Sequence, residues 1–107
     1  MSKGTIQNID CNTLADWLQK GEAFLVDVRE AGEHAGAHIA GSSLNPLSAF
    51  DPSACTPGAG QKLVLYCGSG MRSMKAGKML AASSQAETFN LAGGIMAWQK
   101  AGHPVAR

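Results

Sequence analysis

Short apolar runs alternate with amphipathic segments along the chain, and each run ends in polar or glycine-rich sequence. The runs that predict strands are residues 6–9, 23–28, 42–46, 62–67 and 87–94. The segments that predict helices are residues 10–21, 29–38, 72–83 and 94–102. Brief apolar runs of this kind are typical of strands buried on both faces. The alternation predicts an α/β fold whose parallel sheet is covered by helices on both faces.

The helix predicted over residues 72–83 has an unusual apolar face. Helical spacing places Ser73, Ala76, Gly77, Leu80 and Ala81 on one side, and four of these five residues are small. A face of small side chains lets a helix lie close to a sheet.

Length and composition limit the possibilities. With 107 residues, 45% apolar and 16% charged, the chain is long enough for one globular domain and no more. A net charge of +1 offers no electrostatic basis for binding nucleic acid or an anionic membrane. The first ten residues have no apolar signal core, and no apolar run approaches the roughly 18 residues of a membrane span. We therefore expect a cytoplasmic protein without nucleic-acid or membrane partners.

The cysteines and histidines give no framework for disulfides or metal. Cys11, Cys55 and Cys67 are odd in number and unevenly spaced, which makes a poor disulfide framework. His34 and His38 lie four residues apart but lack a nearby third ligand. We expect neither a metal nor another cofactor.

Cys67 stands out because it ends the run KLVLYC and precedes a Gly-Ser-Gly loop. Ligands bind at the carboxyl ends of strands in open parallel sheets. Gly68 and Gly70 allow a tight loop whose N–H groups point inward, and the following helix adds the positive end of its dipole. Both effects favour a thiolate, as does the charge of Arg72. A cysteine at a strand end is often inert packing, but inert packing does not require this loop.

Four motifs resemble those of the rhodanese family of sulfurtransferases. The segment CGSGMRS resembles the active-site loop, and FLVDVRE resembles the strand that ends in Asp-Val-Arg. GAHIAGSSLNPL and LAGGIMAWQKAGHPV resemble the family's Gly-His-Ile and closing Gly-Gly segments. They occur in family order and cover about Ile6 to Val105, so the resemblance implies one domain over residues 1–107 with its core at about residues 6–105. Ala37 and Ala40 depart from the family's glycine and proline, which concerns a turn and not the chemistry.

The resemblance implies a single rhodanese-like domain with a five-stranded, mostly parallel sheet, and catalysis by Cys67. The cysteine would take sulfane sulfur from thiosulfate or a low-molecular-weight persulfide, and pass it to cyanide, a thiol or a protein. By the family pattern, the substrate-binding groups are the backbone N–H groups of the loop, those of Gly68, Ser69, Gly70, Met71, Arg72 and Ser73.

Loop length favours sulfur over phosphate chemistry. Four residues separate Cys67 from Arg72, whereas protein tyrosine phosphatases and related cell-cycle phosphatases have five between the corresponding residues. The shorter loop makes a tighter ring of N–H groups, which suits a sulfur atom better than a tetrahedral phosphate. Arg72 is the only basic residue of the loop, and the sequence leaves open whether Lys75 faces its mouth. The donor therefore stays open.

Two other interpretations stay open beside the enzyme. A rhodanese-like domain can be a non-catalytic binding module, or it can relay sulfur to one specific protein. The intact loop favours activity. We expect Asp27 and Arg29 to support the site, with Arg29 paired to Glu33 or another acid.

Overall fold

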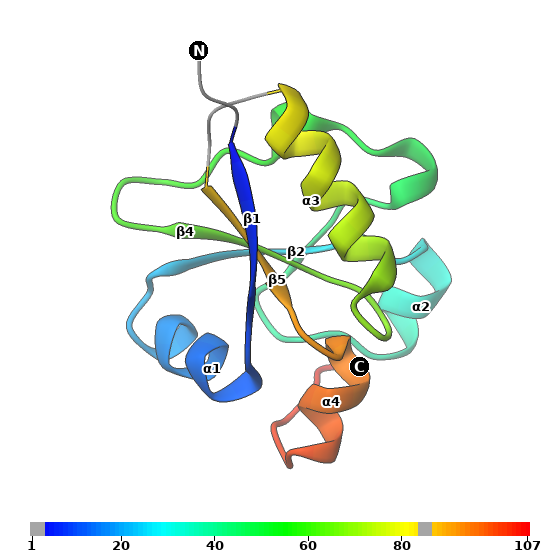
Figure 1. Cartoon of the computed structure of the whole chain (residues 1–107). Helices are drawn as coiled ribbons and strands as arrows, with labels where there is room; N and C mark the ends of the chain where they lie inside the picture. Colours follow the sequence, from blue (N-terminus) through cyan, green and yellow to red (C-terminus); the bar gives the residue numbers. More distant parts are fainter. Residues whose placement is uncertain (1–3, 84–86) are drawn as a thin grey trace.

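A computed structural model of the chain describes residues 4–83 and 87–107 (Figure 1). The strands are β1 (Thr5–Ile9), β2 (Ala23–Asp27), β3 (Ser43–Leu44), β4 (Lys62–Tyr66) and β5 (Glu87–Leu91). The helices are α1 (Cys11–Gln19), α2 (Ala31–Gly36), α3 (Met71–Ser83) and α4 (Gly94–Lys100), with 3-10 turns at Leu47–Ala49 and Pro52–Ala54. Within the described residues, no helix combines the length and apolar character needed to cross a membrane.

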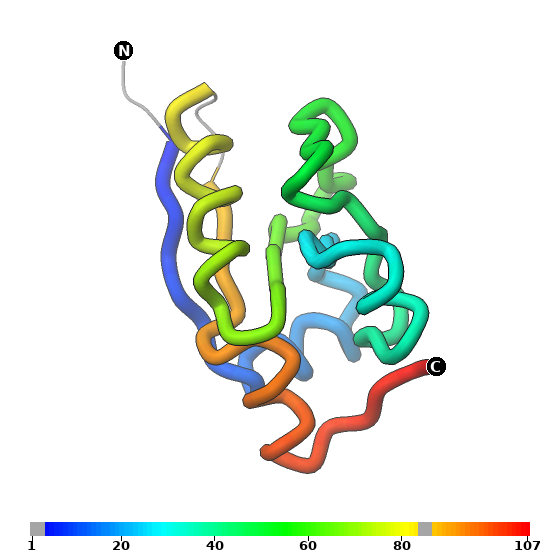
Figure 2. The backbone as a smooth tube through the Cα atoms, turned by 90° about the vertical axis from the view of Figure 1, so that its right-hand side faces the viewer, coloured from blue at the N-terminus to red at the C-terminus, as the bar shows by residue number. Residues whose placement is uncertain are grey.

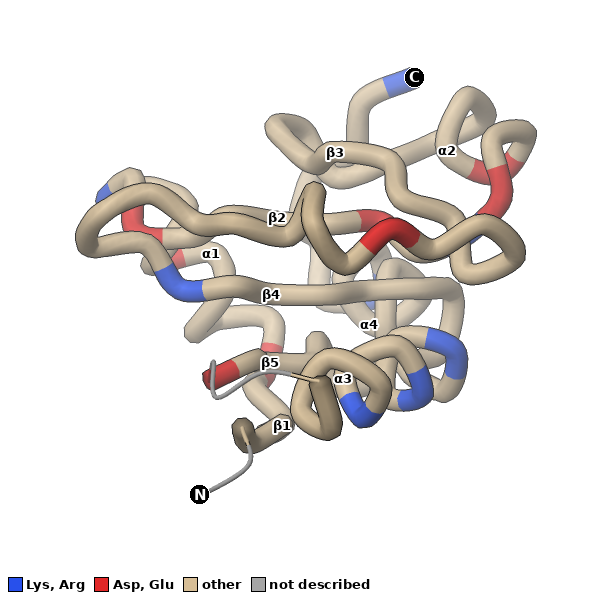
Figure 3. Tube along the Cα trace, turned by 90° about the horizontal axis from the view of Figure 1, so that it is seen from above, with Lys and Arg blue, Asp and Glu red and all other residues tan. Residues whose placement is uncertain are grey.

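The five strands form one sheet in the order β1-β5-β4-β2-β3, which is visible from above in Figure 3. All four pairings between neighbouring strands are parallel, so the predicted α/β architecture is confirmed. The central strand β4 places Leu65 opposite Val26 of β2 and opposite Asn90 of β5. The carboxyl ends of the strands therefore meet at one edge, and Cys67 follows the middle strand of that edge.

Side-chain alternation divides the core between the two faces of the sheet. Val64 and Tyr66 belong to the core formed with α1 and α4, whereas Leu63, Leu65 and Cys67 belong to the core formed with α3. Helices therefore cover both faces, as the apolar runs predict. Because side chains alternate along a strand, the same periodicity that buries β4 directs the sulfur of Cys67 toward α3.

Helix α3 lies close to the sheet through its small residues. Ser73, Ala76 and Gly77 are buried, as the helical pattern predicts. A Cβ atom on Gly77 would lie 2.8 Å from Cγ1 of Ile6 in β1, so the side chain of Ile6 packs directly against the helix backbone. The close packing fixes the beginning of α3, and with it the loop that carries Cys67.

Candidate active site

The loop between β4 and α3 is tied to the turn between β5 and α4. Gly70 has a φ of +99°, a backbone conformation that residues other than glycine rarely adopt. A Cβ atom at this position would lie 3.2 Å from the backbone nitrogen of Gly93 and 3.4 Å from the carbonyl oxygen of Leu91. Gly70 is therefore required both for its backbone conformation and for the close approach of the two segments.

The first turn of α4 holds the loop from the other side. The N–H of Ile95 donates to the carbonyl of Cys67 over 2.9 Å, and the N–H of Met96 donates to the carbonyl of Gly68 over 3.1 Å. Figure 2 shows the start of α4 beside this loop. With these carbonyls bound to α4, the loop can turn its own N–H groups toward the cysteine.

The sulfur of Cys67 is buried and surrounded by hydrogen-bond donors. Cys67 is only 1% exposed, the N–H of Gly70 lies 3.1 Å from Sγ, and the hydroxyl oxygen of Ser73 lies 3.4 Å from it. Burial raises the pKa of the thiol. The Ser73 hydroxyl and the N–H groups of Ser73, Gly70 and Ser69 outweigh burial, so the pKa of Cys67 is lowered overall. The arrangement stabilises a thiolate, which is the nucleophilic form of cysteine.

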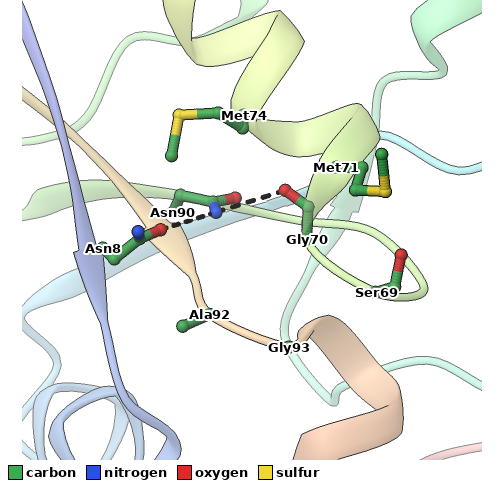
Figure 4. Close-up of a pocket in the computed structure, with 8 residues that line it drawn as sticks. All are labelled: Asn8, Ser69, Gly70, Met71, Met74, Asn90, Ala92 and Gly93. Atoms are coloured by element: carbon green, nitrogen blue, oxygen red, sulfur yellow. Dashed lines mark hydrogen bonds between the residues drawn. The ribbon is translucent and has the colours of Figure 1, made fainter.

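Asn90 of β5 joins this network, although no sequence motif around it marks it as part of the site. Its side-chain oxygen accepts a hydrogen bond from the hydroxyl of Ser73. Its amide nitrogen donates to the carbonyl of Gly70 (3.3 Å) and to Oδ1 of Asn8 (2.9 Å), two bonds drawn in Figure 4. These bonds fix the orientation of the amide. Because the hydroxyl of Ser73 has one proton, Asn90 competes with the sulfur of Cys67 for it.

The side chain of Arg72 is fixed by an ion pair with Glu33 of α2. The guanidinium makes two bonds to the carboxylate, of 2.8 and 2.9 Å. Hydrogen bonds from Arg72 lower the pKa of Glu33 to about 2, and the pKa of Arg72 is raised by Glu33 and also by Cys67. Of the two alternatives expected for Arg29, Glu33 or another acid, the structure has the second: Arg29 pairs with Asp27, while Glu33 is bound to the arginine of the loop.

Comparison with known proteins gives the family. The family description "Rhodanese-like domain" matches residues 10–101. The chain belongs to the rhodanese-like domain family. A sulfurtransferase of Allochromatium vinosum is 31% identical over 101 residues, which cover 94% of each protein. The solved structure of a rhodanese-related protein from Thermoplasma volcanium superimposes with a TM-score of 0.79 at 26% identity, and covers 94% of this chain and 97% of that one.

Other relatives are longer than this chain. An uncharacterised protein of Synechocystis is 36% identical over 109 residues, and the match spans 61% of its length. The probable adenylyltransferase/sulfurtransferase MoeZ of Mycobacterium tuberculosis is 35% identical over 94 residues, which is 24% of its length. Family membership and the Allochromatium relative support a sulfur-transfer role for this rhodanese-like domain.

Asp27 and Arg29 form a buried ion pair beneath α2 of the rhodanese-like domain. Asp27 is fully buried and Arg29 is 6% exposed; Nη2 of Arg29 lies 2.8 Å from Oδ2 of Asp27, and it also donates to the carbonyl of Ala37 over 2.6 Å. His34 of α2 places Nδ1 2.9 Å from the same carboxylate oxygen. Burial raises the pKa of Asp27, but hydrogen bonds from Arg29 and His34 lower it below its ordinary value. The pair anchors the helix that carries Glu33, which is a position suited to a supporting role.

A pocket of about 400 Å³ borders the loop on the side of β1 and β5 (Figure 4). It is lined by Asn8, Ser69, Gly70, Met71, Met74, Asn90, Ala92 and Gly93, and none of these is charged. Cys67 does not line it. Met71 is 78% exposed at its rim, and Lys75 is exposed one turn further along α3.

The other two cysteines lack the surroundings of Cys67. Burial is the largest influence on both Cys11 and Cys55, and it raises the pKa of each thiol. Neither thiol is therefore activated as the loop cysteine is.

Proposed function

We propose that the chain is a sulfurtransferase that carries sulfane sulfur as a persulfide on Cys67. The donor is thiosulfate or a low-molecular-weight persulfide, and the acceptor is cyanide, a thiol or a protein. The observation that carries the proposal is the ring of N–H groups and the Ser73 hydroxyl around a buried sulfur whose pKa is lowered.

Each half of the reaction balances without an added oxidant or base. The Cys67 thiolate attacks the outer sulfur of thiosulfate, a Cys–S–S⁻ persulfide forms, and the broken S–S bond leaves its electron pair on sulfite. Cyanide or a thiolate then takes the outer sulfur, and the electron pair returns to Sγ of Cys67. The negative charge moves between Sγ and the outer sulfur during this cycle, so fixed N–H dipoles around the loop stabilise both states.

A non-catalytic binding module is the second candidate, from a different class of function. It would have no need of a thiolate-stabilising loop, whereas here the loop residues converge on the sulfur. A relay to a specific protein would use the same persulfide and differ only in its acceptor.

The test is the intact mass of the reduced protein after incubation with thiosulfate and, separately, with glutathione persulfide. We expect one added sulfur that cyanide removes and that Cys67→Ser does not acquire. Cys11→Ser and Cys55→Ser serve as matched controls and should load normally. Loading of the Cys67→Ser protein would show that another residue is the nucleophile, and no loading from either donor would favour the binding module.

A further inference from the structure

The positive charge at the active-site loop is already paired with a carboxylate. Nη2 of Arg72 would lie 3.4 Å from a Cβ atom on Gly68, so the guanidinium lies over the first residue of the loop. Both of its terminal nitrogens bond to Glu33, a residue 39 positions away in the sequence. An anion that approaches the loop therefore meets an ion pair and not a free cation.

The position of Glu33 does not depend on Arg72 alone. Its Oε1 also accepts the N–H of Glu30 over 3.0 Å, which fixes the carboxylate on the first turn of α2. The buried Asp27–Arg29 pair holds α2 in place from below, through His34. The carboxylate is thus built into the fold at the mouth of the loop.

The pocket beside the loop has no charged residue in its lining. The pocket beside the loop presents amide, hydroxyl and methionine side chains of Asn8, Ser69, Met71, Met74 and Asn90. Figure 3 places further basic residues along α3, where Lys75 and Lys78 are exposed. Neither lines the pocket.

We propose that Glu33 is a specificity-determining residue that disfavours doubly charged donors such as thiosulfate and favours organic persulfides with one negative charge. The inference rests on the proposed function and names the donor class for it. With an organic persulfide R–S–S⁻, the Cys67 thiolate attacks the outer sulfur and a new S–S bond forms. The S–S bond of the donor breaks, its electron pair stays on the inner sulfur, and RS⁻ leaves as a thiolate that takes a proton from water. A second negative charge on the donor increases its repulsion by Glu33, because the energy scales with the product of the charges.

The substitution Glu33→Gln removes the negative charge of the carboxylate and should leave the fold unchanged. Glutamine keeps a side-chain oxygen for the N–H of Glu30, as glutamine does at this position of a capping box. Glu30→Gln is the matched control, since it removes a carboxylate from the same end of α2. Glu30 accepts a bond from the hydroxyl of Ser48 over 2.6 Å and lies outside the pair with Arg72.

The first measurement is the ratio of kcat/KM for thiosulfate to that for the persulfide of 2-mercaptoethanol, at low ionic strength. We expect this ratio to rise about fivefold in Glu33→Gln and to change by less than about twofold in Glu30→Gln, because exposed charges act weakly and over short range. An unchanged ratio in Glu33→Gln, or an equal rise in the control, would overturn the proposal.

The second measurement does not require sulfur transfer. Sulfate, a non-reacting dianion, should protect Cys67 from alkylation by iodoacetamide at about fivefold lower concentration in Glu33→Gln than in the wild type, at matched ionic strength. Equal protection in both proteins would refute the role of Glu33. Stronger protection without loading from either donor would keep that role and reject the proposed function instead.

Discussion

Replacement of Ser73 by alanine should raise the pKa of Cys67. The hydroxyl of Ser73 is 3.4 Å from Sγ, and both residues are buried at or below 1% exposure. The substitution removes one donor to the thiolate and leaves the N–H groups of the loop in place. It also deletes only one buried oxygen, so the fold should persist.

The size of the expected pKa shift follows from the free energy that one hydrogen bond contributes. A hydrogen bond to a charged group contributes about 1.5–3 kcal/mol, and a pKa change of one unit corresponds to about 1.4 kcal/mol. The full bond would thus raise the pKa by about one to two units. Because Asn90 competes for the same proton, we expect the lower end, about one unit.

The assay is the rate at which iodoacetamide alkylates Cys67 between pH 5 and pH 10, followed by peptide mass. Cys11 and Cys55 are distinguished by their peptides, and burial raises the pKa of both thiols. Ser69→Ala is the matched control, because the side chain of Ser69 is exposed and its backbone N–H is the group that lowers the pKa of Cys67. A midpoint that stays the same or falls in Ser73→Ala would show that the hydroxyl proton resides on Asn90 and does not stabilise the thiolate.

Two further predictions concern the frame of the site. Asp27→Asn leaves the buried guanidinium of Arg29 without a full counter-charge and should reduce the free energy of unfolding in urea by about 3 kcal/mol at pH 7. The pKa of Asp27 is lowered on folding, so its contribution is fully present above about pH 4 and is lost progressively as the pH falls from there through the folded-state pKa. The gap between the two proteins should therefore be smaller at pH 3 than at pH 7, and an equal gap at both pH values would contradict this assignment. Gly94→Ala would place Cβ 2.5 Å from the carbonyl oxygen of Gly68 at a φ of +61°, and should abolish persulfide loading and lower Tm, whereas Gly36→Ala, with open space around it, should do neither. Normal loading by Gly94→Ala would mean that the loop does not depend on this contact.

The sequence predicts those parts of the molecule that depend on local patterns. Alternation along residues 62–67 and the glycines that follow place Cys67 at a strand end, and the small residues of the next helix predict its close approach to the sheet. Both features arise within about twenty residues of one another. The parallel sheet follows from the order of strands and helices, although that order does not reveal that β1 pairs with β5 at the edge.

The parts that the sequence does not predict depend on contacts between distant segments. Glu33 is a plausible partner for the nearby Arg29, yet Arg29 folds back onto Asp27 because both side chains are buried at the same strand end. This leaves Glu33 for Arg72, 39 residues away. In the sequence, Asn90 is likewise one polar residue within an apolar run. Its contact with Ser73 could not be predicted, because it depends on the pairing of β5 with β4.

The site therefore separates two electrostatic tasks. The thiolate of Cys67 is stabilised by N–H groups and a hydroxyl, which are neutral dipoles buried from solvent and fixed by the fold. In the proposed function, donor recognition would involve Arg72 and Glu33, whose side chains are about 40% exposed. Salt screens exposed charges far more than buried dipoles. If Glu33 selects the donor as proposed, the reactivity of the cysteine and the choice of donor can change independently, because the first depends on the position of the loop and the second on a single carboxylate of α2.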